Sequence, residues 1–267
     1  MTSGIIQLVS NSDSTPFLTG NPQITFFESL FKSYSNFYIT KIEQQINGTP
    51  NFGNTINSVL SKSGDLLKNI YLDITLPDLN KPLNASWYGY TNNIGCNIID
   101  SISFKINDQV IDKLYGESID IYNNINGLDE SDLLLEFNSD HSIRNIGSSI
   151  PLEKRHCYIK LPFWFSKNTG SALPLIALNN SDISIDIEFR NLNNVVKTDN
   201  YYKLSDITIK SDSEFECKLI TECIYLDQKE LQFFSTKPHE YLIEQLQYNG
   251  DDVFTRFEKK KRYILKF

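Results

Sequence analysis

Apolar and polar side chains alternate with a period of two over most of the chain, which is the pattern of half-buried β-strands. The clearest case spans residues 183–189, where Ile, Ile, Ile and Phe occupy every second position. Residues 70–76 alternate in the same way and end at Pro77, and residues 215–226 form another such segment. Shorter strands are predicted over residues 37–46, 55–60, 158–165 and 203–209.

Two further segments add a turn and a helix to this pattern. Residues 101–106 alternate, and Asn107 and Asp108 then separate them from Val110 and Ile111, which predicts a β-hairpin. Residues 116–137 differ because their apolar side chains fall near helical spacing, although Gly127 interrupts the series. A helix is expected there, and residues 133–137 are expected to begin a second short one.

Many short strands without regular strand-helix alternation predict an antiparallel sandwich or barrel. The connections are rich in Asn, Ser and Gly, and residues 81–95 and 129–151 exceed the usual hairpin length. Long loops on a β scaffold commonly project from it and make the contacts. These two loops are therefore expected to carry interactions.

The composition changes after Asp227. A linker is predicted over residues 228–240, after which residues 241–248 regain strand character. The remaining residues, to position 267, are too few to form a domain of their own.

The segment 18–37 combines a turn with a large apolar area. Gly20, Asn21 and Pro22 are turn-forming residues, each for its own conformational reason. Residues 24–37 contain four Phe and one Tyr, which is more apolar area than a free tail keeps in water. The segment is therefore predicted to be an arm that docks on another surface.

The net charge of -8 indicates that phosphate binding is not the main function. The basic run at residues 259–262 has two interpretations, a phosphate contact or the polar end of an edge strand, and the acidic whole favours the second. No apolar run approaches the roughly 18 to 20 residues that span a bilayer, and no basic segment opens a signal peptide. Neither direct nucleic-acid binding nor membrane insertion is expected.

The sequence offers little catalytic chemistry. It contains no phosphate-binding loop of the Walker type and no Gly-x-Ser-x-Gly motif, and His141, His156 and His239 are scattered. No catalytic residue, cofactor or metal site is predicted, and the protein is not expected to be an enzyme. The four cysteines are predicted to be free and buried: Cys96, Cys157, Cys217 and Cys223.

Several short motifs follow one another in a characteristic order along nearly the whole chain. They are LTGNPQITFF (18–27) followed by NF (36–37), ING (46–48), FG (52–53), GDL (64–66), IDK (111–113), LPFWF (161–165), LPLIAL (173–178) and HEYLIEQLQ (239–247). Their order and spacing resemble the N-terminal portion of the major capsid proteins of nucleocytoplasmic large DNA viruses.

The resemblance implies an all-β protein with an antiparallel jelly-roll sandwich, the first of a double jelly roll, carrying a short helical insertion. The implied divisions are an N-terminal arm (1–36), the first jelly roll (37–227), the linker (228–240) and the opening strands of an incomplete second jelly roll (241–267). The implied function is structural: a homotrimer forms a pseudo-hexagonal capsomer, and neighbouring capsomers tile an icosahedral shell. Minor capsid proteins under the shell are implied partners, with assembly in the host cytoplasm and the virion as the final location.

In this family the arm lies beneath the capsomer, against neighbours or minor capsid proteins. One departure concerns that arm, because relatives carry an arginine pair where this chain has Phe31-Lys32-Ser33-Tyr34. The alternative function is a carbohydrate- or receptor-binding jelly-roll module. The arm residues expected to carry assembly are Leu18, Thr19, Gly20, Asn21, Pro22, Gln23, Ile24, Thr25, Phe26 and Phe27.

Overall fold

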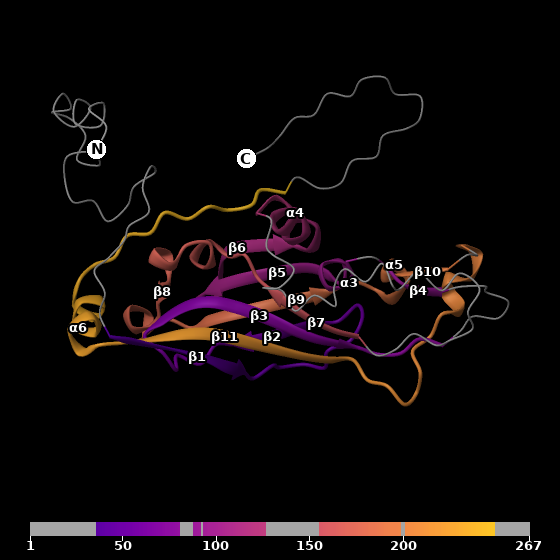
Figure 1. Ribbon diagram of the computed structural model, residues 1–267, viewed down its shortest axis with the longest axis horizontal. Helices are drawn as coiled ribbons and strands as arrows, with labels where there is room; N and C mark the ends of the chain where they lie inside the picture. The colour runs from indigo at the N-terminus through magenta and orange to yellow at the C-terminus, as the bar shows by residue number, and fades with distance from the viewer. Residues whose placement is uncertain (1–35, 81–87, 92, 127–154, 199–200, 249–267) are drawn as a thin grey trace, which may run out of the picture.

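A computed structural model describes residues 36–80, 88–91, 93–126, 155–198 and 201–248 (Figure 1). Within these residues the main body is two antiparallel sheets. The first has the strand order β1 (Phe37–Gln44), β11 (Glu216–Leu226), β3 (Leu66–Leu76) and β7 (Arg155–Lys160), with β8 (Leu173–Pro174) also paired to β3. The second has the order β2 (Thr55–Val59), β9 (Ile183–Phe189), β5 (Ile99–Ile106) and β6 (Gln109–Tyr115).

This strand order is that of a jelly roll. Without the short strands β4 (Tyr88–Tyr90), β8 and β10 (Val196–Thr198), eight strands remain in the described chain. Counted in chain order, one sheet contains the first, last, third and sixth of them, and the other contains the second, seventh, fourth and fifth. Strands far apart in sequence therefore pair, such as β1 with β11. The predicted antiparallel jelly-roll sandwich is confirmed.

The alternation seen in the sequence places one face of each strand in a shared core. Ile183, Ile185 and Ile187 of β9 are buried, as are Leu72 and Ile74 of β3 in the opposite sheet, and all five belong to one apolar cluster. Polar residues take the intervening positions and face outward. The core thus lies between the sheets, where burial removes the most apolar area from water.

The predicted hairpin is present between β5 and β6. Asn107 and Asp108 form its two-residue loop, with φ angles of 49° and 64°. Positive φ at both loop residues matches the twist of the flanking strands, and Asn and Asp tolerate that conformation better than other side chains.

Helices and short ribbons cover the ends of the sandwich (Figure 1). At one end β4 (Tyr88–Tyr90) pairs with β10 (Val196–Thr198) beside α5 (Leu192–Val195). α6 (Gln228–Thr236) lies at the other end. The remaining helices are α3 (Ile94–Asn97), α4 (Gly116–Asn126) and the 3-10 helices Trp164–Ser166, Thr169–Ser171, Leu175–Leu178 and Tyr201–Asp206.

Two strand predictions were wrong in part. The strand expected over residues 158–165 ends at Lys160, because Pro162 cannot donate a ladder hydrogen bond, and a 3-10 helix follows at Trp164–Ser166. Residues 203–209 form no strand of their own. A 3-10 helix occupies Tyr201–Asp206, and Ile209 makes a single β-bridge to Leu79.

The region after β11 contains a helix that was not predicted from the sequence. Helix α6 occupies most of the expected linker, and Asp227 caps it by accepting a hydrogen bond from the Gln228 N–H. Phe234 then packs on Leu66 and Ile224 in a small second apolar cluster. Residues 241–248 follow as chain without strand pairing in the described structure.

The predictions for the two long loops and for the helix between them had different outcomes. Residues 88–90 of the expected long loop 81–95 form β4, which pairs with β10 as a short ribbon. The predicted helix within residues 116–137 is confirmed as α4. The loop 129–151 and the second short helix at 133–137 lie outside the described residues.

Candidate assembly surface

Residues 241–248 run along the β6 edge of the sandwich toward α4 (Figure 1). We call this segment the strap. Its first residue is its deepest anchor: the Tyr241 hydroxyl donates a 3.1 Å hydrogen bond to the Ala172 carbonyl, and its ring meets Trp164 edge-on with 5.5 Å between ring centroids. Burial raises the pKa of the Tyr241 hydroxyl to about 12. The strap is therefore anchored by both an apolar and a polar contact.

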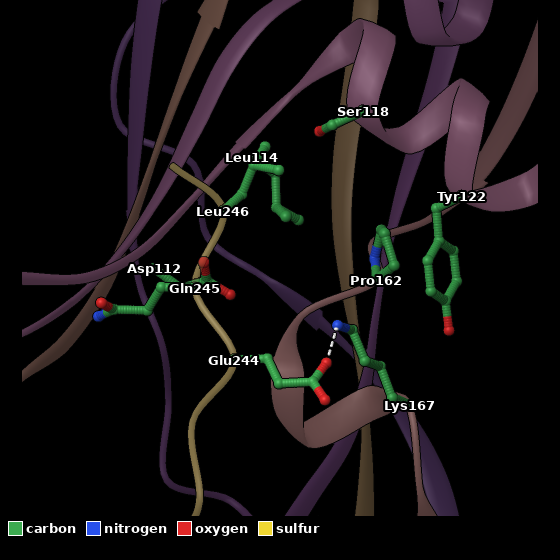
Figure 2. A pocket seen from close by; sticks show the side chains of 9 residues that line it. All are labelled: Asp112, Leu114, Ser118, Tyr122, Pro162, Lys167, Glu244, Gln245 and Leu246. Atoms are coloured by element: carbon green, nitrogen blue, oxygen red, sulfur yellow. Dashed lines mark hydrogen bonds and ion pairs between the residues drawn. The ribbon is translucent and has the colours of Figure 1, made fainter. Parts of the chain in front are cut away.

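Further contacts fix the rest of the strap. Glu244 forms a 2.7 Å ion pair with Lys167, and Figure 2 shows the two side chains pointing toward one another. Gln245 donates from its Nε2 to the Ile111 carbonyl of the edge strand β6. Tyr248 ends the strap with its ring centroid 4.6 Å from that of Tyr115. The Gln245 contact satisfies an outward carbonyl of β6, which has a partner strand on one side only in the described chain.

A pocket of about 210 Å³ lies between the strap and the sandwich. Asp112 is one of its lining residues; it is buried, and its Oδ1 has no hydrogen-bond partner in the described structure. Burial raises the pKa of the Asp112 carboxyl, although the backbone N–H of Lys113, the charge of Lys167 and the backbone N–H of Trp164 act in the opposite direction. The lining residues are Asp112, Leu114, Ser118, Tyr122, Pro162, Lys167, Glu244, Gln245 and Leu246 (Figure 2).

A second pocket, of about 420 Å³, lies where the end of the strap passes α4. Arg190 spans its polar side by pairing with both Asp100 and Glu117. Exposed apolar side chains of α4 and of the strap line the same pocket: Ile121, Leu246 and Tyr248. This part of the molecule therefore combines fixed charges with apolar area, as protein interfaces do.

The outer face of the first sheet is a second candidate surface. The rings of Tyr71 and Tyr158 stack with 5.0 Å between centroids, and the Lys41 ammonium lies 4.7 Å from the Tyr71 centroid. Glu222 accepts hydrogen bonds from Tyr71 and Asn69. These contacts fix the positions of the side chains relative to one another. The face therefore presents a defined arrangement of aromatic rings and charges.

The histidines and cysteines singled out in the sequence have structural roles where they are described. His156 pairs with Asp73 at 2.5 Å, and His239 Nε2 lies 2.9 Å from the Phe234 carbonyl. All four cysteines lie in the described residues and none forms a disulfide; they are buried except for Cys217, which is half-buried. In the described part of the chain, no three His, Cys, Asp or Glu side chains gather as a metal site requires. Nor does any helix described there have the length and apolarity to cross a membrane.

The predicted arm residues, Leu18 to Phe27, lie outside the described structure. The contacts of the strap, by contrast, were not predicted from sequence. No feature of the sequence signalled these contacts, because Tyr241 and Tyr248 at its two ends also suit the strand predicted over residues 241–248.

Comparison with known proteins identifies the fold and the family. The family model described as "Major capsid protein N-terminus" matches residues 25–227. The chain is 34% identical to a major capsid protein of Pyramimonas orientalis virus, covering 94% of this chain and 60% of that protein. It is 33% identical to the major capsid protein of Paramecium bursaria Chlorella virus 1, covering 96% of this chain and 55% of that protein.

Solved structures agree with the sequence comparison. The PBCV-1 virus capsid matches with a TM-score of 0.62 and 28% identity over 84% of this chain and 50% of that chain. The Faustovirus major capsid protein shares the fold, with a TM-score of 0.53 over 79% of this chain and 58% of that chain, at 10% identity. The chain thus spans about half to 60% of the length of these relatives. Together with the jelly-roll strand order, these matches show that the chain belongs to the major capsid protein family of large DNA viruses.

Proposed function

We propose that the chain is a shell-forming subunit that assembles as a homotrimer into a pseudo-hexagonal capsomer. The observation that carries this proposal is the family match over residues 25–227, which coincides with a complete eight-stranded jelly roll. The strap and the charged, aromatic face of the first sheet supply fixed contact surfaces on that scaffold. Assembly would bury such surfaces between copies and gain free energy from the apolar area removed from water.

In this proposal the function is mechanical rather than catalytic. Closed symmetry sets the geometry of the trimer, and the contacts between capsomers extend it into a shell. Minor capsid proteins beneath the shell are the proposed additional partners, reached through the arm residues 18–27. Assembly is proposed to take place in the host cytoplasm.

The oligomeric state tests the proposal directly. Sedimentation velocity of the purified chain over a wide concentration range is expected to show a trimer or larger species. A strict monomer at the highest concentrations would count against assembly by this chain. A glycan array on the same sample tests the alternative function, since specific sugar binding by a monomer would favour a carbohydrate-binding module.

A further inference from the structure

Four apolar side chains lie exposed where β1 begins. Phe37, Tyr38 and Ile39 are the first three residues of the strand, and their exposed fractions are 56%, 65% and 39%. Tyr225 of β11 pairs with Tyr38, lies 6.3 Å from it between ring centroids and is 39% exposed. We call these four residues the β1 patch. Phe37 and Ile39 lie on one face of the strand, and Tyr38 with its neighbour Tyr225 lies on the other, so the exposed apolar area wraps around the edge of the sheet. Apolar area of this kind in contact with water marks a surface that has a partner.

The β1 patch lies on an open edge and continues a core that is already formed. In the described chain, β1 pairs with β11 on one side only. Ile39 is paired with Ile224, which packs with Leu66 and Phe234 in the small cluster under α6. A further apolar segment placed at this edge would extend that cluster and cover the strand edge at the same time.

The chain just before β1 has the composition to do this. Residues 24–31 read ITFFESLF and contain five large apolar side chains. Residues 32–36, KSYSN, connect them to Phe37 and are rich in polar, turn-forming side chains. Five residues fall within the usual length of a connection between adjacent elements.

We propose that residues 24–31 cover the β1 patch of their own chain. The short connection gives this segment a high local concentration at the patch, whereas a second copy would first lose translational and rotational freedom. The arm then has two parts: residues 24–31 complete the fold of the jelly roll, so that, of the arm residues 18–27 expected to carry assembly, residues 18–23 stay available for neighbouring subunits. The experiments below use the isolated full chain and do not depend on shell assembly.

A charge placed in the segment tests the contact. Phe27→Asp in the full chain is expected to lower the midpoint of thermal unfolding by about 4 °C or more, because an aspartate cannot be buried against the patch. Phe17→Asp is the matched control, since it makes the same change in the arm outside residues 24–31, and it is expected to leave the midpoint unchanged. An unchanged midpoint in Phe27→Asp would overturn the proposal.

A double-mutant cycle with Ile39→Asp links the segment to the patch. If the two sites touch, the double variant is expected to lose less than the sum of the two single losses, because the second charge disrupts a contact that is already broken. Strictly additive losses would mean that residue 27 docks elsewhere and would overturn the proposal.

Cross-linking distinguishes the same chain from a second copy. Oxidation of Phe27→Cys/Ile39→Cys at low micromolar concentration is expected to give a disulfide within one chain, seen as a faster monomer band on a non-reducing gel. Phe27→Cys alone and Ile39→Cys alone are the controls, because any link that they form within one chain must involve a native thiol, such as that of the half-buried Cys217. A dimer band would assign the patch to a second copy, and the absence of any link would leave it uncovered by this segment; either result overturns the proposal.

Discussion

Glu244 and Lys167 form a 2.7 Å ion pair between segments that are 77 residues apart in the sequence. Lys167 follows the 3-10 helix after β7, and Glu244 lies at the middle of the strap. Both residues line the pocket that also contains the buried Asp112 (Figure 2). It therefore couples the chain that leaves the jelly roll to the edge of the sandwich.

Removing the charge of Glu244 should loosen the strap slightly. The pair is largely exposed on the Glu244 side, so Glu244→Gln is expected to cost at most about 1 kcal/mol of docking free energy. Limited proteolysis measures this. At low salt, cleavage within the strap should be faster in Glu244→Gln than in the parent, and the cleavage rate of the variant should not depend on salt. Glu240→Gln, a nearby exposed carboxylate, is the control and should keep the salt dependence of the parent. Equal salt dependence in all three proteins would contradict the role of the pair.

Replacing Asp112 should make the protein more stable at neutral pH. Because the folded-state pKa of Asp112 is raised above its usual 3.8, the native state binds its proton more tightly than the unfolded state does. The contribution of this bound proton to the free energy of unfolding is complete below the usual pKa of an aspartate, and it is lost as the pH rises through the raised pKa of Asp112. Asp112→Asn is therefore expected to match the parent near pH 3 and to exceed it at pH 7 by on the order of 1 kcal/mol.

Urea unfolding at both pH values measures the effect. Asp206→Asn removes an exposed carboxylate and is expected to change stability by less than about 0.5 kcal/mol at either pH. A loss of stability at pH 7 in Asp112→Asn would show instead that the charged carboxylate is needed where it lies.

Gly116→Ala should destabilise the start of α4. A Cβ at this position would lie 2.5 Å from the Ile99 carbonyl oxygen and still closer to that of Cys96, and both obstacles are backbone. The expected cost is about 1–3 kcal/mol, because the helix must shift away from α3 and β5. Thermal unfolding measures the change, with exposed Asn124→Ala on the same helix as the control. A parent-like midpoint in Gly116→Ala would refute the close approach.

Deleting residues 1–20 should separate assembly from folding. The deletion removes Leu18, Thr19 and Gly20 from the predicted assembly arm but keeps residues 24–31, so the midpoint of thermal unfolding is expected to stay the same. Sedimentation is expected to show reduced formation of large assemblies. Loss of the folded monomer would contradict the assignment of these residues to contacts between subunits.

The parts of the fold that sequence predicted depend on local pattern. Ile183, Ile185 and Ile187 alternate strictly, so their strand and its buried face could be predicted. Asn107 and Asp108 identified the hairpin turn because the residue types that tolerate positive φ are few. Residues 203–209 show the limit of this reasoning, since their composition suits a strand but the described structure gives them only one bridge, between Ile209 and Leu79.

The candidate surface could not be predicted in the same way. The strap looked like a strand because five of its eight residues are apolar or aromatic, yet the described structure holds it by single side-chain contacts such as Gln245 to Ile111. Helix α6 was missed because its burial depends on Leu66 and Ile224, which come from two distant strands.

The sequence by itself determined the sheet class, the main strands and the hairpin, and the order of its motifs indicated the capsid family. These features follow from short-range periodicity and turn chemistry, which act over a few residues. Only the tertiary structure decided that the buried Asp112 shares a pocket with Glu244 and Lys167 and that Phe37, Tyr38 and Ile39 lie exposed on a strand that is at the edge of its sheet in the described part of the chain. Burial and exposure depend on which distant segments meet, and a linear pattern does not specify those partners.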